Sequence, residues 1–173
     1  LSHNAIEAQV YDYALLQDQS MAAAFYADKP DEYAHVPENF VKLADMVLAH
    51  SPECKLILEH TWGYKKEDCK GFKTVENFNN MLREGCATIA ALKNAEISHI
   101  GDAFIAVDTK ELGNSLHASD DHHQSYYGSY LKACVNYLMI TGEPFNENVA
   151  NCGIDPQKAE ILRKAAEKTV LGE

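Results

Sequence analysis

The chain has 173 residues, enough to bury a sizeable hydrophobic core, and its 46% apolar and 24% charged composition is that of a globular protein. A formal net charge of −11 argues against nucleic acid or an anionic membrane as a partner, because both carry negative charge themselves. Neither a signal peptide nor an apolar run of membrane-spanning length is recognisable.

The first predicted elements lead to a polar segment. Residues Ser2–Val10 read as the end of a helix, and the apolar run Tyr13–Leu16 predicts a short buried strand. Gln17 follows that strand directly. Because ligands of open parallel sheets gather at the carboxyl ends of the strands, Gln17 is a candidate binding residue. Capping of the following loop is the alternative role for this side chain.

The next segment combines a long loop, a helix and a second strand. Ser20–Pro37 is expected to be irregular, and Glu38–His50 has the apolar spacing of a helix. Lys55–Glu59 predicts a strand covered on both faces, since its apolar residues are continuous. Trp62 follows this strand, where it is a candidate wall for a sugar or acyl group; packing in the core is the alternative.

The remaining elements continue the alternation of strand and helix. They are a charged loop at Lys65–Lys73, a long helix at Thr74–Asn94, a short strand at Ile97–Ile100, a short helix at Ala103–Val107, and a last helix from Asp155-Pro156 to about Val170. The alternation predicts the α/β class, as a three-layer α/β/α sandwich around a parallel sheet. We expect residues 1–173 to form a single domain.

The stretch Leu116–Gly142 joins a dense group of ionisable residues to a helix. Asp120, Asp121, His122 and His123 are consecutive, and apolar residues then recur at helical intervals. Ser125 is a natural N-cap, because its hydroxyl can accept from free amides of the first turn, while Gly142 is a natural stop. The acidic and imidazole side chains are therefore expected immediately before a helix start.

Asp120-x-x-His123 has the spacing of a general base, in which the carboxylate orients the imidazole and the imidazole removes a proton from a nucleophile. A solvated loop rich in Asp and His is one alternative. A metal site is another, although adjacent side chains are expected to point in divergent directions. Its possible ligands are His117, Asp120, Asp121, His122 and His123.

The run Asp120–Ser125, followed by Gly128 and Leu131, resembles the last block of the SGNH/GDSL-type hydrolases, which reads Asp-x-x-His-Pro-Ser and then Gly-x-x-Leu. Gln124 stands where that family usually has Pro. Three further stretches resemble a poorly characterised bacterial branch related to carbohydrate esterases. They are Tyr11–Ser20, Leu56–Trp62 and Ile100–Phe104.

The resemblance implies a flavodoxin-like parallel sheet and a serine ester hydrolase that removes acyl groups, most simply acetyl, from a carbohydrate. His123 would be the general base, Asp120 its orienting partner, and Gln17 part of the oxyanion hole. We expect His122 to point elsewhere. The resemblance implies no metal and no cofactor. The rival function is a non-catalytic carbohydrate-binding or structural protein on the same scaffold.

The nucleophilic serine has no match in the chain. Gly113-Asn114-Ser115 imitates the family's Gly-Asp-Ser motif, but it lies in a polar loop with no strand before it. In the family that motif follows the first strand, upstream of the segment matching Leu1, so we expect an N-terminally incomplete chain. Tyr13–Leu16 should pair with Leu56–Leu58 on one side. On its other side we expect polypeptide from outside this numbering, since a bare apolar edge is costly.

The cysteines show no CxxC spacing, which disfavours zinc-ribbon and thioredoxin-like sites. Cys86 and Cys134 lie on apolar helical faces and are expected in the core. Cys69 and Cys152 lie in polar sequence, where a disulfide is conceivable if the protein is exported. An extracellular or periplasmic location would suit a hydrolase of this branch, but the redox compartment stays open.

Overall fold

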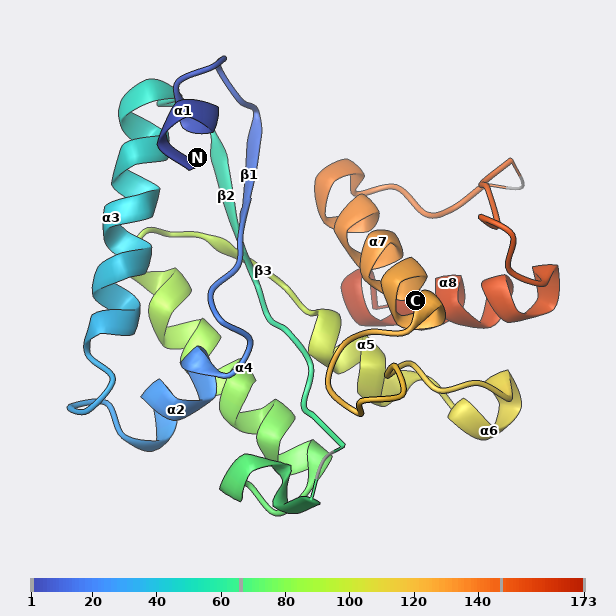
Figure 1. The fold of residues 1–173 in the computed structure, drawn as a ribbon. Coiled ribbons are helices and arrows are strands. Elements are labelled where there is room, and N and C mark those ends of the chain that lie inside the picture. Colours follow the sequence, from blue (N-terminus) through green and yellow to red (C-terminus); the bar gives the residue numbers. More distant parts are fainter. Residues whose placement is uncertain (1, 66, 147, 173) are drawn as a thin grey trace. The chain divides into compact units, whose positions relative to one another are not determined.

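The computed structural model describes residues 2–65, 67–146 and 148–172. It divides into two compact units (Figure 1). The first unit consists of Leu1–His60 and Met81–Ser98, and the second of Thr61–Asn80 and His99–Glu173.

A three-stranded parallel sheet forms the centre of the first unit, in the order β1 (Tyr13–Leu16), β2 (Lys55–Glu59), β3 (Glu96–Ser98). Leu15 is opposite Ile57 in the β1–β2 pair, so the pairing predicted between these two strands is confirmed. β1 and β2 have the predicted bounds. The third strand is shorter at its C-terminal end than predicted, because Ile100 begins a helix instead.

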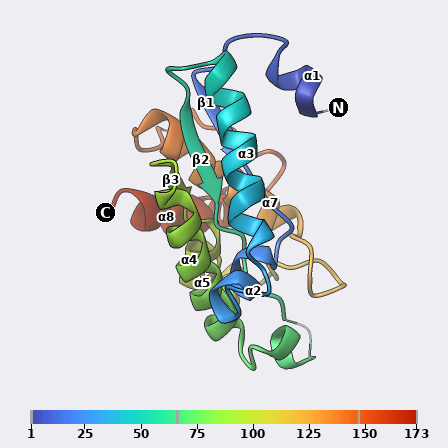
Figure 2. The same ribbon diagram turned by 90° about the vertical axis from the view of Figure 1, so that its left-hand side faces the viewer.

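Four helical segments belong to the first unit: α1 (Ser2–Ile6), α2 (Ala22–Asp28), α3 (His35–His50) and the part of α4 (Val75–Ala91) from Met81 onward. In Figures 1 and 2, α3 and this part of α4 lie on the same face of the sheet. Their apolar faces are buried, as Ala44 and Val47 in α3 and Leu82 and Ile89 in α4 illustrate.

Helix α2 lies where an irregular loop was predicted. Its first three residues are alanines, the strongest helix formers, and all three are buried. The contact with α4 depends on Gly85: a Cβ atom there would lie 1.9 Å from the carbonyl oxygen of Ala23. The helix is therefore stabilised by a close backbone approach to a residue far along the chain, which local sequence does not reveal.

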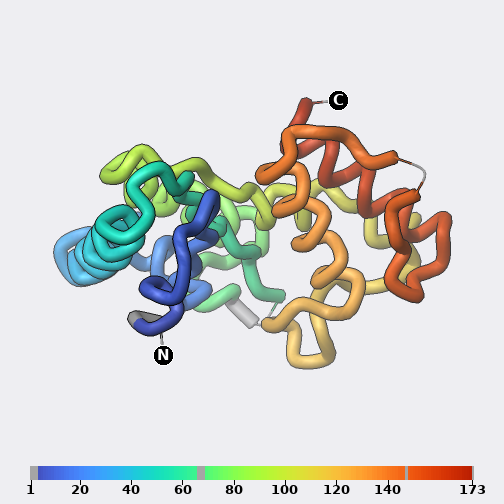
Figure 3. Tube along the Cα trace, turned by 90° about the horizontal axis from the view of Figure 1, so that it is seen from above, coloured from blue at the N-terminus to red at the C-terminus, as the bar shows by residue number. Residues whose placement is uncertain are grey.

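The second unit is mainly helical. It contains the 3₁₀ turn η1 (Glu67–Gly71), α5 (Ile100–Ala106), α6 (Thr109–Leu112), α7 (Tyr126–Thr141) and α8 (Pro156–Val170). Helices α5, α7 and α8 pack on one another, and Figure 3 shows α7 and α8 side by side. Their contact surfaces are fully buried side chains such as Phe104, Leu131, Leu138 and Leu162.

Both long helices of the second unit begin and end where the sequence predicted. The Ser125 hydroxyl accepts from the backbone N–H of Gly128, and the Asp155 carboxylate accepts from the amides of the first turn of α8, with Pro156 at its first position. Gly142 ends α7 in the left-handed region, at φ 68°. Capping thus fixes the entry of α7 directly after the Asp/His cluster.

The predicted class is confirmed: the fold is mixed α/β, with a parallel sheet and helices packed around it, consistent with an α/β/α sandwich. Among the described residues, no helix combines the length and the apolar character that a membrane span requires.

Candidate functional site

A tight loop in the second unit carries the Asp/His cluster. Its two arms are joined by an antiparallel bridge between His117 and Gln124 and by a hydrogen bond of 2.8 Å from the Ala118 amide to the His123 carbonyl. Between the arms, Asp121 adopts φ 56°, a left-handed conformation that Asp tolerates better than most residues. The chain therefore reverses within a few residues and returns to the N-cap of α7.

Asp120 and His123 make the contact that their spacing predicts. The Asp120 Oδ2 atom lies 2.6 Å from His123 Nδ1, and Asp120 Oδ1 accepts from the backbone amides of His122 and His123, each at 3.0 Å. The hydrogen bond from His123, followed by those two amides, lowers the pKa of the Asp120 carboxyl far below its usual range. Asp120 is thus an ionised acceptor at neutral pH.

This contact also determines the state of the imidazole. An ionised carboxylate can only accept, so neutral His123 must carry its proton on Nδ1 and present a lone pair on Nε2. Within the described part of the chain, Nε2 has no hydrogen-bond partner. The side chain of His123 is 68% exposed and that of Asp120 is 43% exposed. The arrangement can therefore accept a proton from a group that approaches from solvent.

His122 does not point away from the pair, so that expectation is wrong. Its ring stacks on the ring of His123, with centroids 4.2 Å apart and planes inclined by 21°, and it also contacts the ring of Tyr64 at 3.9 Å. The tight loop, which turns at the left-handed Asp121, thus holds the two adjacent imidazoles in contact.

Trp62 packs beneath the Asp/His loop in the core and binds its backbone. Its indole N–H donates to the carbonyl oxygen of His122 at 3.0 Å, and its ring stacks on Phe104 at 4.7 Å. Only 6% of the residue is exposed. The geometry therefore favours the packing role that the sequence left open for Trp62, and a direct contact with substrate stays a prediction.

His117 is a buried part of the same loop. Its Nε2 lies 2.9 Å from the Gly63 carbonyl oxygen, which accepts its proton, while Nδ1 has no hydrogen-bond partner among the described residues. Burial is the main cause that lowers the pKa of His117, and the charge of Lys65 lowers it further. This side chain, counted among the possible metal ligands, is thus a neutral core residue.

Ser115 occupies a loop after a helix. Gly113 ends α6 at φ 68°, so no strand precedes the Gly113-Asn114-Ser115 motif, as the sequence predicted. The Ser115 hydroxyl accepts from the His117 amide, and Lys65 Nζ lies 3.4 Å from it. Asn114 is held by the Lys158 ammonium at 2.5 Å. These contacts stabilise the start of the Asp/His loop.

Gln17 belongs to the first unit, where it is exposed directly after β1. His123 and Trp62 belong to the second unit, so the role of Gln17 in an oxyanion hole beside His123 stays a prediction.

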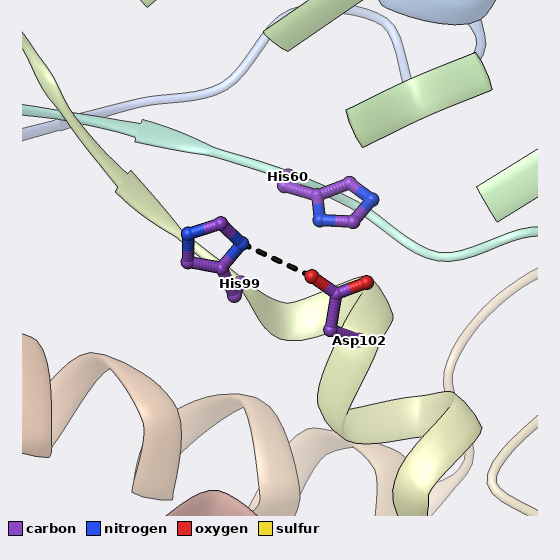
Figure 4. A group of neighbouring side chains, drawn as sticks. All are labelled: His60, His99 and Asp102. Carbon is purple, nitrogen blue, oxygen red and sulfur yellow. Dashed lines mark hydrogen bonds and ion pairs between the residues drawn. The ribbon is translucent and has the colours of Figure 1, made fainter. Parts of the chain in front are cut away.

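A second His–Asp pair of the second unit was missed by sequence reasoning. His99 Nδ1 lies 3.1 Å from Asp102 Oδ2 in the first turn of α5, as the dashed line in Figure 4 shows, and Asn79 Nδ2 donates to Asp102 Oδ1 at 2.9 Å. His60, also labelled there, belongs to the other unit and follows β2. The signal was available: His99 follows a strand and is three residues from an Asp.

The cysteines give no support to a disulfide. No disulfide joins Cys69 and Cys152, the pair considered for one, and Cys86 and Cys134 are buried as expected. Burial raises the pKa of the Cys134 thiol to about 12, so that residue is protonated and packs as an apolar side chain.

Comparison with known proteins identifies a fold. No protein-family model and no curated protein matches the chain. A DUF4886 family protein from Bacteroides uniformis has a similar crystal structure, with a TM-score of 0.80 and 22% identity over 98% of this chain. The chain spans 66% of that protein, slightly less than two thirds. A candidate SGNH hydrolase from Slackia heliotrinireducens matches at a TM-score of 0.62 and 22% identity, over 79% of this chain and 70% of its own. At these identities the similarity shows that the chain shares the fold of these two proteins.

Proposed function

We propose that the protein is a serine ester hydrolase that removes acyl groups, most simply acetyl, from a carbohydrate. One observation carries this proposal: an ionised Asp120 accepts from Nδ1 of His123, whose side chain is 68% exposed. The SGNH-like fold supports it, because one neighbour of similar structure is described as a candidate SGNH hydrolase.

In the proposed reaction, His123 Nε2 takes the proton of a serine hydroxyl while the serine oxygen bonds to the ester carbonyl carbon. The resulting imidazolium is stabilised by the Asp120 carboxylate, which holds its Nδ1–H. Backbone amides, together with the Gln17 side chain, would stabilise the oxyanion. His123 then returns its proton to the departing sugar oxygen. In the second half, His123 takes a proton from water while the water oxygen bonds to the acyl carbon. His123 then returns that proton to the serine oxygen as the acyl group leaves as an acid.

We propose that the nucleophilic serine comes from polypeptide outside residues 1–173, carried by a strand that pairs with the outer edge of β1. In the first unit, β1 is an edge strand with β2 as its neighbour, and Leu15 is 37% exposed. A groove of about 380 Å³ runs along it, lined by apolar residues including Ile6, Tyr13 and Leu16. The longer chain of the Bacteroides protein offers the length that such a strand requires.

The catalytic proposal is tested by acetyl release from acetylated saccharides by the full-length gene product. His123→Ala should lower kcat by about 10²–10⁴-fold, the usual contribution of a general base. His122→Ala is the matched control and should retain most of the activity, because the proposed reaction transfers no proton through its ring and the backbone carbonyl that binds Trp62 is retained. Saccharide binding without any acetyl release in the unsubstituted protein would favour the non-catalytic alternative.

The strand proposal is tested by amide hydrogen exchange in the same protein. The β1 amides that point away from β2 should exchange as slowly as the amides of β2 itself. The opposite edge strand, β3, is the internal comparison. Rapid exchange along the outer edge of β1 would show that no strand pairs there.

A further inference from the structure

We propose that Asp120, His122 and His123 form a binding site for a divalent transition-metal ion such as Zn²⁺, and that the bound ion inhibits the hydrolase. The metal site rests on geometry alone, whereas inhibition rests on the proposed function. The three residues each offer a ligand atom, and these atoms lie within 4.8 Å of one another.

The conformation of the loop allows neighbouring residues to bind one ion. Adjacent side chains normally diverge, but the left-handed turn at Asp121 and the two amides bound to Asp120 Oδ1 wrap the backbone around the carboxylate. The rings of His122 and His123 consequently stack at 4.2 Å, on the side where Asp120 Oδ2 already contacts His123. Two imidazoles and one carboxylate therefore share one small region.

Imidazole nitrogen and carboxylate oxygen are ligands that Zn²⁺ accepts, and three protein ligands leave a fourth position for water. Tetrahedral zinc at bond lengths of about 2.0–2.1 Å places its ligand atoms about 3.3 Å apart. The atoms, now within 4.8 Å of one another, must therefore approach by up to about 1.5 Å. Rotation of exposed side chains permits this, since His123 is 68% and Asp120 43% exposed. The backbone meanwhile stays fixed by Trp62, which donates to the His122 carbonyl.

His117 is not a fourth ligand, although the sequence counts it among the candidates. It is 6% exposed, and its Nε2 is engaged with the Gly63 carbonyl. The inferred site thus consists of residues that solvent reaches.

Metal binding and proton transfer exclude each other at His123. If Nε2 binds the ion, its lone pair is no longer available to a serine proton. If Nδ1 binds the ion, the imidazole proton moves to Nε2, which then cannot accept either, and the hydrogen bond to Asp120 is lost. Both modes predict inhibition that is relieved by a chelator.

The test uses the full-length protein freed of metal by a chelator and titrated with zinc chloride in a calorimeter. We expect one ion per chain. His122→Ala and His123→Ala should each weaken binding about tenfold or more, because each removes a ligand. His35→Ala, which removes an exposed histidine of the first unit, is the matched control and should bind zinc like the unsubstituted protein.

Inhibition is measured separately, with each variant compared with its own zinc-free rate of ester cleavage. Zinc should inhibit the unsubstituted protein, and about tenfold more zinc should be needed for His122→Ala. The metal site would be overturned, whatever the activity, if zinc binding did not saturate at one ion per chain. It would also be overturned if His122→Ala bound zinc as tightly as the unsubstituted protein does. Activation by zinc would overturn the inhibitory role. If the protein binds zinc but cleaves no ester under any condition, the metal site is supported and the proposed hydrolase function is wrong.

Discussion

Two histidine–aspartate pairs of the second unit have the same spacing and opposite surroundings. His99 is the N-cap residue of α5 and lies 3.1 Å from Asp102 of the first turn, whose carboxylate is also bound by the buried Asn79. Asp120 and His123 lie in a loop, 2.6 Å apart, with the carboxylate bound by two backbone amides. In each pair both oxygens of the carboxylate accept hydrogen bonds.

The two pairs differ in how far solvent reaches the imidazole ring. The side chain of His123 is 68% exposed, whereas those of His99 and Asp102 are 37% and 21% exposed. A base must meet a substrate group as well as hold its proton in the correct place. Spacing alone therefore does not distinguish the two pairs, and the greater exposure of His123 is what favours the Asp120–His123 pair as the proposed base.

The largest expected effect comes from the same substitution in each pair. Asp120→Asn should lower kcat/KM for ester cleavage by about 10²-fold or more, because the amide neither fixes the tautomer of His123 nor stabilises its imidazolium. Asp102→Asn should lower it much less and should reduce thermal stability instead. Steady-state kinetics and thermal unfolding of the two variants decide the comparison. A larger kinetic loss for Asp102→Asn would assign the base to His99.

A smaller effect is expected at the side chain that supports Asp102. Asn79 is 1% exposed, and Asn79→Ala removes a 2.9 Å hydrogen bond to a carboxylate, at a cost of about 2 kcal/mol in the free energy of unfolding. Urea unfolding measures this loss. Asn39→Ala, in an exposed position of α3, is the control and should change stability little. Equal stability of the two variants would show that the Asn79–Asp102 bond contributes nothing net.

Helices with local end signals were predictable from the sequence. Ser125 and Gly142 define α7, and Asp155-Pro156 starts α8, because capping uses groups within a few residues of the helix end. The contact between Asp120 and His123 was predictable for the same reason: both groups belong to one turn of chain.

Features that depend on distant partners were not predictable. Helix α2 packs on α4 through Ala23 and Gly85, and Asn79 reaches Asp102 from another helix. The contact between the rings of His122 and His123 depends on the conformation of the whole loop, including the left-handed Asp121, and not on sequence spacing. Periodicity and motif spacing contain no information on any of these contacts.

The smallest expected effect concerns His117, the buried histidine of the Asp120–His123 loop. Because burial lowers its pKa below the usual 6.5, the unfolded chain binds this proton more readily than the folded protein does. Neutral His117 therefore makes its full contribution to the free energy of unfolding above about pH 6.5. This contribution is lost as the pH falls from there toward the lower pKa of the folded protein. One proton limits the slope to about 1.4 kcal/mol per pH unit.

His117→Asn should remove this part of the pH dependence, since an asparagine does not titrate and can still donate toward the Gly63 carbonyl. Urea unfolding between about pH 7.5 and pH 5, followed by the fluorescence of Trp62, reports on this loop because Trp62 is the single tryptophan and binds the His122 carbonyl. Several other groups titrate in the same range, so the quantity to compare is the difference between the variant and the unsubstituted protein. His35→Asn, at an exposed position, should retain the original slope. If His117→Asn retains it as well, the folded loop does not lower the pKa of His117, and the nearby carboxylates of Asp120 and Asp121 offset its burial.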